Sequence, residues 1–263
     1  IGGGVIGLEM ASYFNSAGCK VTVVEMLDHI AGPTDREIST ILYNNYKKLG
    51  VDFRLSAKVT QITSGTVVFE TAEGLQSVPA DKVLVSIGRR PKTDGIGLET
   101  IQVETERGRI VTDENMKTNI PEVYAVGDVN GVSMLAHTAY REAEVCVNTI
   151  LGKKDRMRYN AIPSVIYTNP EVASVGETEE SAKQNGLDVE IVKLPLSYSG
   201  RYVAETSGGD GIVKVLIDRK YKTIRGVHMI GSYASEIIYG AAMMIETEMR
   251  VEDVRQIVFP HPT

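Results

Sequence analysis

The chain has 263 residues, enough for two modest domains, and its formal net charge is −6, with 34 Asp and Glu against 28 Lys and Arg. The acidic balance and the lack of a basic cluster argue against a nucleic acid partner, and no apolar run approaches the roughly 18 residues that span a bilayer. No signal-peptide pattern opens the sequence, so we expect a soluble, cytoplasmic protein with no membrane partner.

The first residues carry the glycine pattern G-x-G-x-x-G at Gly2, Gly4 and Gly7, followed by a predicted helix over residues 8–17 that Gly18 ends. Gly2 allows a tight turn, Gly4 lets the backbone approach a pyrophosphate, and Gly7 lets the helix pack closely on a strand. The phosphates would lie at the helix N-terminus, where free N–H groups and the helix dipole favour negative charge. The alternative is a chance glycine-rich turn before a helix.

A β-branched run over residues 21–24 predicts a strand that ends in Glu25, which follows Gly2 by 23 residues. An acidic side chain at this spacing accepts hydrogen bonds from the adenosine ribose and repels a 2′-phosphate, so we favour NAD over NADP. Ile1 is not an initiator methionine and lies where a first strand should already be finishing. We therefore expect a fragment of a longer protein.

The next segment alternates a helix with short strands. Gly32 and Pro33 break a loop, Asp35 is a plausible cap for a helix that Gly50 ends, and a strand follows over residues 51–55. Further strands are predicted over 58–63, 66–71, 77–79 and 82–87. The last of these is apolar enough to be buried on both faces.

Two motifs after this point are specific. Residues 86–91, Ser-Ile-Gly-Arg-Arg-Pro, include Gly88, and residues 118–128 read Thr-Asn-Ile-Pro-Glu-Val-Tyr-Ala-Val-Gly-Asp. They resemble the end of the NAD domain and the second flavin-binding motif of the FAD-dependent pyridine nucleotide–disulfide oxidoreductases. Residues 123–126 predict a short buried strand, after which Gly127 allows a close backbone approach and Asp128 lies at the strand's carboxyl end, where ligands bind. The resemblance implies that Asp128 contacts the flavin's ribityl chain; the alternative is a cap or turn residue.

A helix is predicted to open at residues 134–137 and to run to about residue 151. The resemblance implies that its first N–H groups reach the flavin ring. The opening residues are Met134, Leu135, Ala136 and His137. His137 is implied to be a flavin neighbour and not a catalytic group.

Residues 153–156 are interpreted as a solvated linker, after which the pattern becomes α+β. Strands are predicted over 164–167, 172–175, 188–195, 212–218 and 223–230, and helices over 179–185 and 234–247. The second helix presents an apolar face of Ile237, Ile238, Ala241, Met244 and Ile245. This part, down to the final Phe-Pro-His-Pro-Thr, resembles the family's dimerisation domain, which implies a homodimer.

The resemblance also implies roles for three residues. His261 matches a histidine that relays a thiol proton to the disulfide of the other subunit, chemistry that suits an imidazole. Glu9 matches a glutamate that faces the nicotinamide, and Val59 matches a position near the adenine. Glu9 otherwise supplies a favourable charge at a helix N-terminus. Cys19 and Cys146 are interpreted as reduced structural thiols, and no metal site is expected.

Together these features predict an α/β chain with three parts. Residues 1–91 form a Rossmann-like NAD-binding domain without its first strand, residues 92–156 form the C-terminal part of an FAD-binding domain, and residues 157–263 form an α+β dimerisation domain. Without the family's N-terminal half and its redox cysteines, we expect FAD to be lost, the chain to be inactive, and apolar residues such as 123–126 to be exposed, rearranged or covered by a partner chain.

Within the family, Glu25 and the final motif are most similar to the dihydrolipoyl dehydrogenases. This implies NAD and FAD as cofactors and a lipoyl-bearing protein as substrate. Three alternatives stay open: another NAD-linked flavoprotein disulfide reductase, a transhydrogenase, and a silent NAD-binding and dimerisation module.

Overall fold

The structure is a computed structural model that describes residues 1–206 and 211–263. It divides into two compact units. Unit 1 comprises Ile1–Gly88 and Pro163–Thr263, and unit 2 comprises Arg89–Ile162. The domain borders expected at residues 91 and 156 stay predictions.

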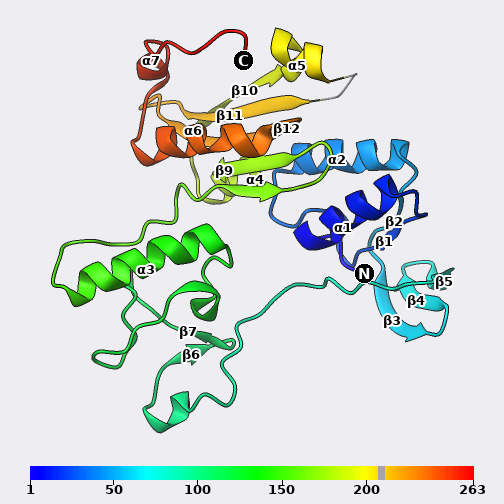
Figure 1. Cartoon of the computed structure of the whole chain (residues 1–263), viewed down its shortest axis with the longest axis horizontal. Helices are drawn as coiled ribbons and strands as arrows, with labels where there is room; N and C mark the ends of the chain where they lie inside the picture. Colours follow the sequence, from blue (N-terminus) through cyan, green and yellow to red (C-terminus); the bar gives the residue numbers. More distant parts are fainter. Residues whose placement is uncertain (207–210) are drawn as a thin grey trace. The chain divides into compact units, whose positions relative to one another are not determined.

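The N-terminal part of unit 1 pairs two helices with a parallel strand pair and a hairpin sheet (Figure 1). Strands β1 and β2 are parallel, with Val23 opposite Phe53, and β3, β4 and β5 form an antiparallel sheet. Strand β5 begins three residues earlier than expected. The bounds are α1 Val5–Ser16, β1 Thr22–Val24, α2 Arg36–Lys48, β2 Asp52–Arg54, β3 Lys58–Thr63, β4 Thr66–Thr71 and β5 Gly74–Pro79.

Helix α2 begins as its sequence predicts. The Asp35 side chain accepts hydrogen bonds from the backbone N–H groups of Glu37, at 3.1 Å, and Ile38, at 3.4 Å. These bonds satisfy donors that have no partner inside the helix. The confirmed cap fixes where the chain turns from the loop into the helix.

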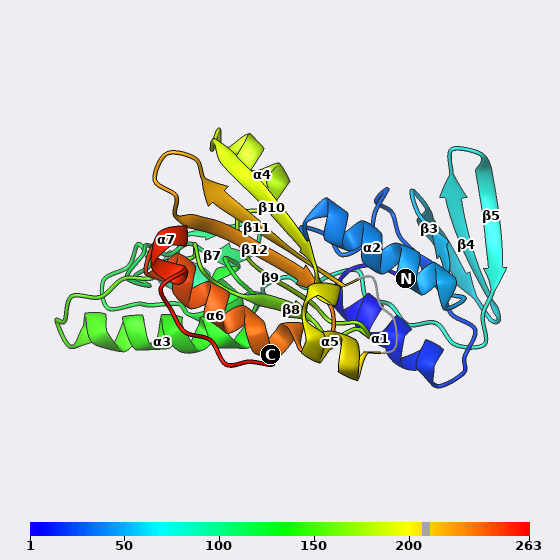
Figure 2. The ribbon, with the colours of Figure 1, turned by 90° about the horizontal axis from the view of Figure 1, so that it is seen from above.

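The C-terminal part of unit 1 is an antiparallel sheet in the order β10-β11-β12-β9-β8, against which helix α6 packs (Figures 1 and 2). Of the predicted apolar face of α6, Ile238, Ala241 and Ile245 are buried and Met244 is half-buried, whereas Ile237 is 52% exposed. A helix buries one stripe, and Ile237 lies beside it. The bounds are β8 Ser164–Ile166, β9 Val172–Gly176, α4 Glu179–Gln184, β10 Val189–Pro195, η3 Leu196–Tyr198, α5 Gly200–Glu205, β11 Ile212–Asp218, β12 Ile224–Ile230, α6 Ala234–Glu246 and α7 Val251–Val254.

One hydrophobic core joins both parts of unit 1. It includes Leu8 of α1 and Leu42 of α2 together with Ile166 of β8, Val172 of β9 and Ile230 of β12. Residues from both ends of the sequence are therefore packed into one body.

The expected strand over residues 82–87 is not formed, and its side chains are not buried: Val85 is 56% exposed and Ile87 is 76% exposed. Ile1 is the described residue that pairs with this segment, donating from its N-terminus to Leu84 O and accepting from Ser86 N, both at 2.8 Å. A strand buried on both faces needs neighbours on both sides. A single pairing residue does not provide them.

Unit 2 holds a small hairpin, two 3-10 turns and one long helix, with two small cores. The bounds are η1 Leu98–Thr100, β6 Thr105–Glu106, β7 Arg109–Ile110, η2 Gly127–Asn130 and α3 Ala136–Ile150. The expected strand over residues 123–126 is replaced by one bridge between Lys117 and Tyr124. Its side chains are packed and not exposed: Val123 lies against the cluster that includes Ile110, and Val126 lies against the cluster that includes Val145.

The expected solvated linker is partly tied down in unit 2. The Asp155 side chain is 16% exposed and lies 2.6 Å from the Arg141 guanidinium of α3. Elsewhere, no helix within residues 1–206 and 211–263 is long and apolar enough to cross a membrane.

Candidate functional site

The glycine turn at the start of unit 1 needs glycine for steric reasons at two positions. Gly2 has φ +97°, and a Cβ there would lie 2.1 Å from Ser86 O; a Cβ at Gly7 would lie 2.1 Å from Gly2 O. At Gly4, no described heavy atom lies within 4 Å of a Cβ built on the backbone. The turn is therefore closed by Gly2 and Gly7 and open beside Gly4.

Glu25 is fixed against this turn. Its Oε2 accepts a hydrogen bond from the Gly3 N–H at 2.5 Å, and its Oε1 accepts one from the Leu27 N–H at 2.7 Å. The carboxylate is half-buried, and carboxylate oxygens have lone pairs for further donors. The acid predicted from its spacing thus lies beside the glycines.

Helix α1 starts at this turn with Gly4 as its N-cap, and no side chain among the described residues caps it. Val5 and Ile6 in its first turn are 41% and 42% exposed. The first N–H groups of an uncapped helix attract anions. The turn therefore has room, donors and a positive helix end for a diphosphate.

Glu9 and Val59 also lie in unit 1, in different surroundings. Oε1 of Glu9 accepts a hydrogen bond from the Tyr167 N–H at 2.9 Å, which joins α1 to the C-terminal part of the unit. Val59 of β3 is half-buried against the cluster of Val24 and Phe69. Gly88 is exposed at the end of the segment that pairs with Ile1.

In unit 2, the turn η2 presents Asp128 to solvent between two buried residues, Gly127 and Asn130. Gly127 has φ +75°, and a Cβ there would lie 3.3 Å from Ala139 Cβ. The glycine lets η2 approach α3 closely. This is a packing reason that the motif alone does not indicate.

A buried carboxylate that the sequence analysis missed holds this turn. Glu142 of α3 is fully buried and accepts hydrogen bonds from Gly127 N, Asn130 Nδ2 and Tyr159 Oη. Burial and the neighbouring carboxylate raise the pKa of Tyr159, which keeps its hydroxyl protonated as a donor. The missed signal is a glutamate on the same helix face as the buried Thr138 and Val145.

Helix α3 begins two residues after Met134. Leu135 is its N-cap, Met134 and Leu135 are half-buried, and Ala136 and His137 are exposed. As at α1, no side chain of the described residues caps this helix. Its first N–H groups are available to a polar ligand.

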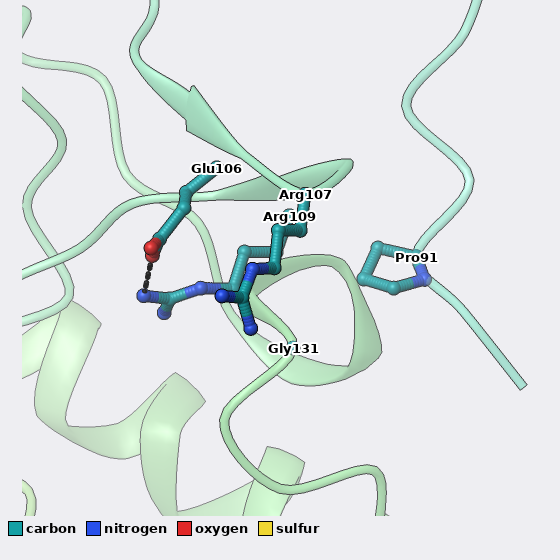
Figure 3. A pocket seen from close by; sticks show the side chains of 5 residues that line it. All are labelled: Pro91, Glu106, Arg107, Arg109 and Gly131. Atoms are coloured by element: carbon teal, nitrogen blue, oxygen red, sulfur yellow. Dashed lines mark hydrogen bonds and ion pairs between the residues drawn. The ribbon is translucent and has the colours of Figure 1, made fainter.

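A hollow of about 450 Å³ lies in unit 2 beside the end of η2 (Figure 3). Its lining consists of Pro91, Glu106, Arg107, Arg109 and Gly131. The Arg109 guanidinium pairs with Glu106 at 2.5 Å, and a Cβ at Gly131 would lie 2.9 Å from Arg109 Cβ. Gly131 therefore lets the end of η2 pack against the hairpin of β6 and β7.

His261 lies in an exposed terminal segment of unit 1. Ser199 anchors this segment by donating from its Oγ to Thr263 O at 2.7 Å. The structure thus brings Gly2, Gly4, Gly7 and Glu25 together, and it gathers Gly127, Asp128 and the start of α3 in the other unit. No group of acidic, cysteine or histidine side chains suited to a metal ion occurs in the described ranges.

Comparisons with known proteins identify the family of this chain. Residues 1–143 match the family described as pyridine nucleotide-disulphide oxidoreductase, and residues 162–263 match the dimerisation domain of that family. The chain is 40% identical over 269 residues to "Dihydrolipoyl dehydrogenase 3" from Pseudomonas putida, covering 100% of this chain and 58% of that protein.

Two solved structures are similar over the whole chain. LpdA from Mycobacterium tuberculosis matches with a TM-score of 0.92 and 26% identity, over 100% of this chain and 57% of that one. The HOCl-induced flavoprotein disulfide reductase RclA from Escherichia coli matches with a TM-score of 0.87 and 28% identity, over 100% and 61%.

The chain spans a little over half the length of the curated relatives it matches. The first match covers the glycine turn and the Asp128 turn, and the second covers the C-terminal sheet. The chain therefore belongs to the pyridine nucleotide-disulphide oxidoreductase family, as the resemblance predicted, and carries that family's dimerisation domain.

Proposed function

We propose that this chain supplies the NAD-binding, second flavin-binding and dimer-forming parts of an NAD-linked dihydrolipoyl dehydrogenase. The whole protein would oxidise dihydrolipoyl groups on a partner protein and reduce NAD. The observation that carries the proposal is the Glu25 carboxylate held against the glycine turn, in a chain 40% identical to dihydrolipoyl dehydrogenases along its full length.

In this function the glycine turn binds the dinucleotide. The first N–H groups of α1 hold the diphosphate over Gly4, where the described residues leave space. Glu25 accepts hydrogen bonds from the ribose hydroxyls and repels a 2′-phosphate, which selects NAD over NADP. Glu9 would face the nicotinamide, Val59 would lie near the adenine, and Gly88 would close the domain.

The residues of unit 2 suit the flavin end of the reaction. Bound FAD supplies the electron relay between the dithiol and the nicotinamide. The exposed Asp128 accepts a hydrogen bond from a ribityl hydroxyl. The uncapped start of α3, Met134 to His137, offers N–H groups to the pyrimidine end of the flavin ring.

His261 acts as the acid–base group for the thiol proton. Its imidazole takes the proton of the thiol that attacks and returns it later, which is work that imidazole performs near neutral pH. Its exposed position suits a contact across a homodimer.

A second candidate is another NAD-linked flavoprotein disulfide reductase. It is supported by the similarity to RclA, with a TM-score of 0.87 over the whole chain. Both candidates use the same nucleotide turn and differ in the dithiol or disulfide they accept.

The nucleotide assignment is tested by titrating the chain with NADH and with NADPH and following nicotinamide fluorescence. We expect NADH to bind more tightly, and Glu25→Gln to weaken NADH binding roughly tenfold, because charged hydrogen bonds contribute about 1.5–3 kcal/mol. Glu73→Gln, in the exposed turn before β5, is the matched control and should leave both affinities unchanged. Equal NADH affinity in Glu25→Gln and the unaltered chain would refute the assignment.

A further inference from the structure

We infer that Glu142 is a positioning residue, which holds the Gly127–Asn130 turn so that Asp128 is presented to the flavin. The inference rests on the proposed function, because it gives the Asp128 turn its ligand. Glu142 itself is fully buried and contacts the turn through hydrogen bonds.

The carboxylate joins both ends of the turn. Oε2 of Glu142 accepts from the Gly127 N–H at 2.5 Å and from Asn130 Nδ2 at 2.9 Å. Asp128 lies between these two residues and is exposed. One buried oxygen therefore determines the spacing of the residues that flank the exposed acid.

The second oxygen is also held. Oε1 of Glu142 accepts a hydrogen bond from Tyr159 Oη at 2.7 Å, which orients the carboxylate. A fully satisfied buried network favours one geometry over others. Replacement of Glu142 by an apolar residue would leave the Gly127 N–H and the Asn130 amide without an acceptor.

Two further contacts restrict the turn without fixing Asp128. Asn130 Oδ1 accepts from Val132 N at 3.0 Å, and Gly131 packs against Arg109 at the hollow of Figure 3. These contacts hold its far end. Glu142 is the described side chain that reaches both ends.

The test uses the flavin-loaded full-length protein that contains this chain. Flavin affinity is measured by reconstituting the apoprotein and following flavin fluorescence. Hydrogen exchange is measured at the backbone N–H of Gly127 and at the side-chain amide of Asn130. The variants are Glu142→Gln and Tyr159→Phe, with Asp128→Asn as the direct comparison. The matched control is Glu144→Gln, an exposed carboxylate on the same helix.

We expect Glu142→Gln to weaken flavin binding about tenfold and to speed exchange at both amides, with KM for NAD unchanged. Tyr159→Phe should weaken flavin binding about threefold, because the hydroxyl acts on the turn through Glu142. It also keeps the inference testable if Glu142→Gln does not fold. Glu144→Gln should match the unaltered protein.

Two results would count against these statements separately. If Asp128→Asn weakens flavin binding while Glu142→Gln and Tyr159→Phe bind flavin normally, the inference is wrong and the proposed function stands. If the unaltered full-length protein binds no flavin, the proposed function fails and the inference with it.

Discussion

Lys214 of β11 is a buried cation on which carboxylates from separate elements converge. Its ammonium lies 2.8 Å from Asp35 and 3.3 Å from Glu37, and it also pairs with Glu179. Burial opposes ionisation of Asp35, yet the hydrogen bond and charge of Lys214 hold the pKa of Asp35 below its ordinary value. Lys214→Met should lower the unfolding free energy by about 3 kcal/mol in urea titrations, because Asp35 stays buried without a counter-charge.

Lys193→Met is the control for this variant, because Lys193 pairs with Glu37 at 2.7 Å near the surface and is 46% exposed. Its loss should change stability by less than about 1 kcal/mol. Equal losses in the two variants would contradict a special role for the buried cation.

Helix α3 is held by Asp155, which follows it in the chain and accepts hydrogen bonds from its side chains. Hydrogen bonds from Arg141 and Asn148 lower the pKa of Asp155 to about 2. A depressed pKa stabilises the fold above the unfolded value of about 3.9, and this stability is lost as the pH falls toward 2. Asp155→Asn should therefore flatten the loss of thermal stability between about pH 4 and 2, measured by circular dichroism, whereas Glu144→Gln should keep the steeper profile.

The whole molecule combines the glycine turn with a dimerisation domain and has two free cysteines, Cys19 and Cys146. Because disulfide chemistry needs two neighbouring thiols, we expect the chain alone, supplied with FAD, NAD and dihydrolipoamide, to form no NADH above the uncatalysed rate. Sedimentation at several concentrations should show a dimer. Turnover by the purified chain would contradict the first expectation, and a monomer at all concentrations would contradict the second.

Much of the local structure could be predicted because its causes lie within a few residues. The Asp35 cap of α2 was confirmed, and its side chain bonds to amides two and three residues away. The expected strands over 82–87 and 123–126 were wrong for the opposite reason. A strand needs partners elsewhere in the chain, and those segments have one pairing residue and one bridge, respectively.

The sequence by itself determined the family, the glycine turn and the acid beside it, because a positive φ and a close backbone approach leave glycine as the residue that fits. Only the tertiary structure decided which charges are buried. Lys214 meets Asp35 across 179 residues, and Glu142 meets Gly127 and Tyr159 across 15 and 17. Sequence periodicity shows which face of a helix is inward, whereas the partner of an inward charge depends on which distant segment folds against it.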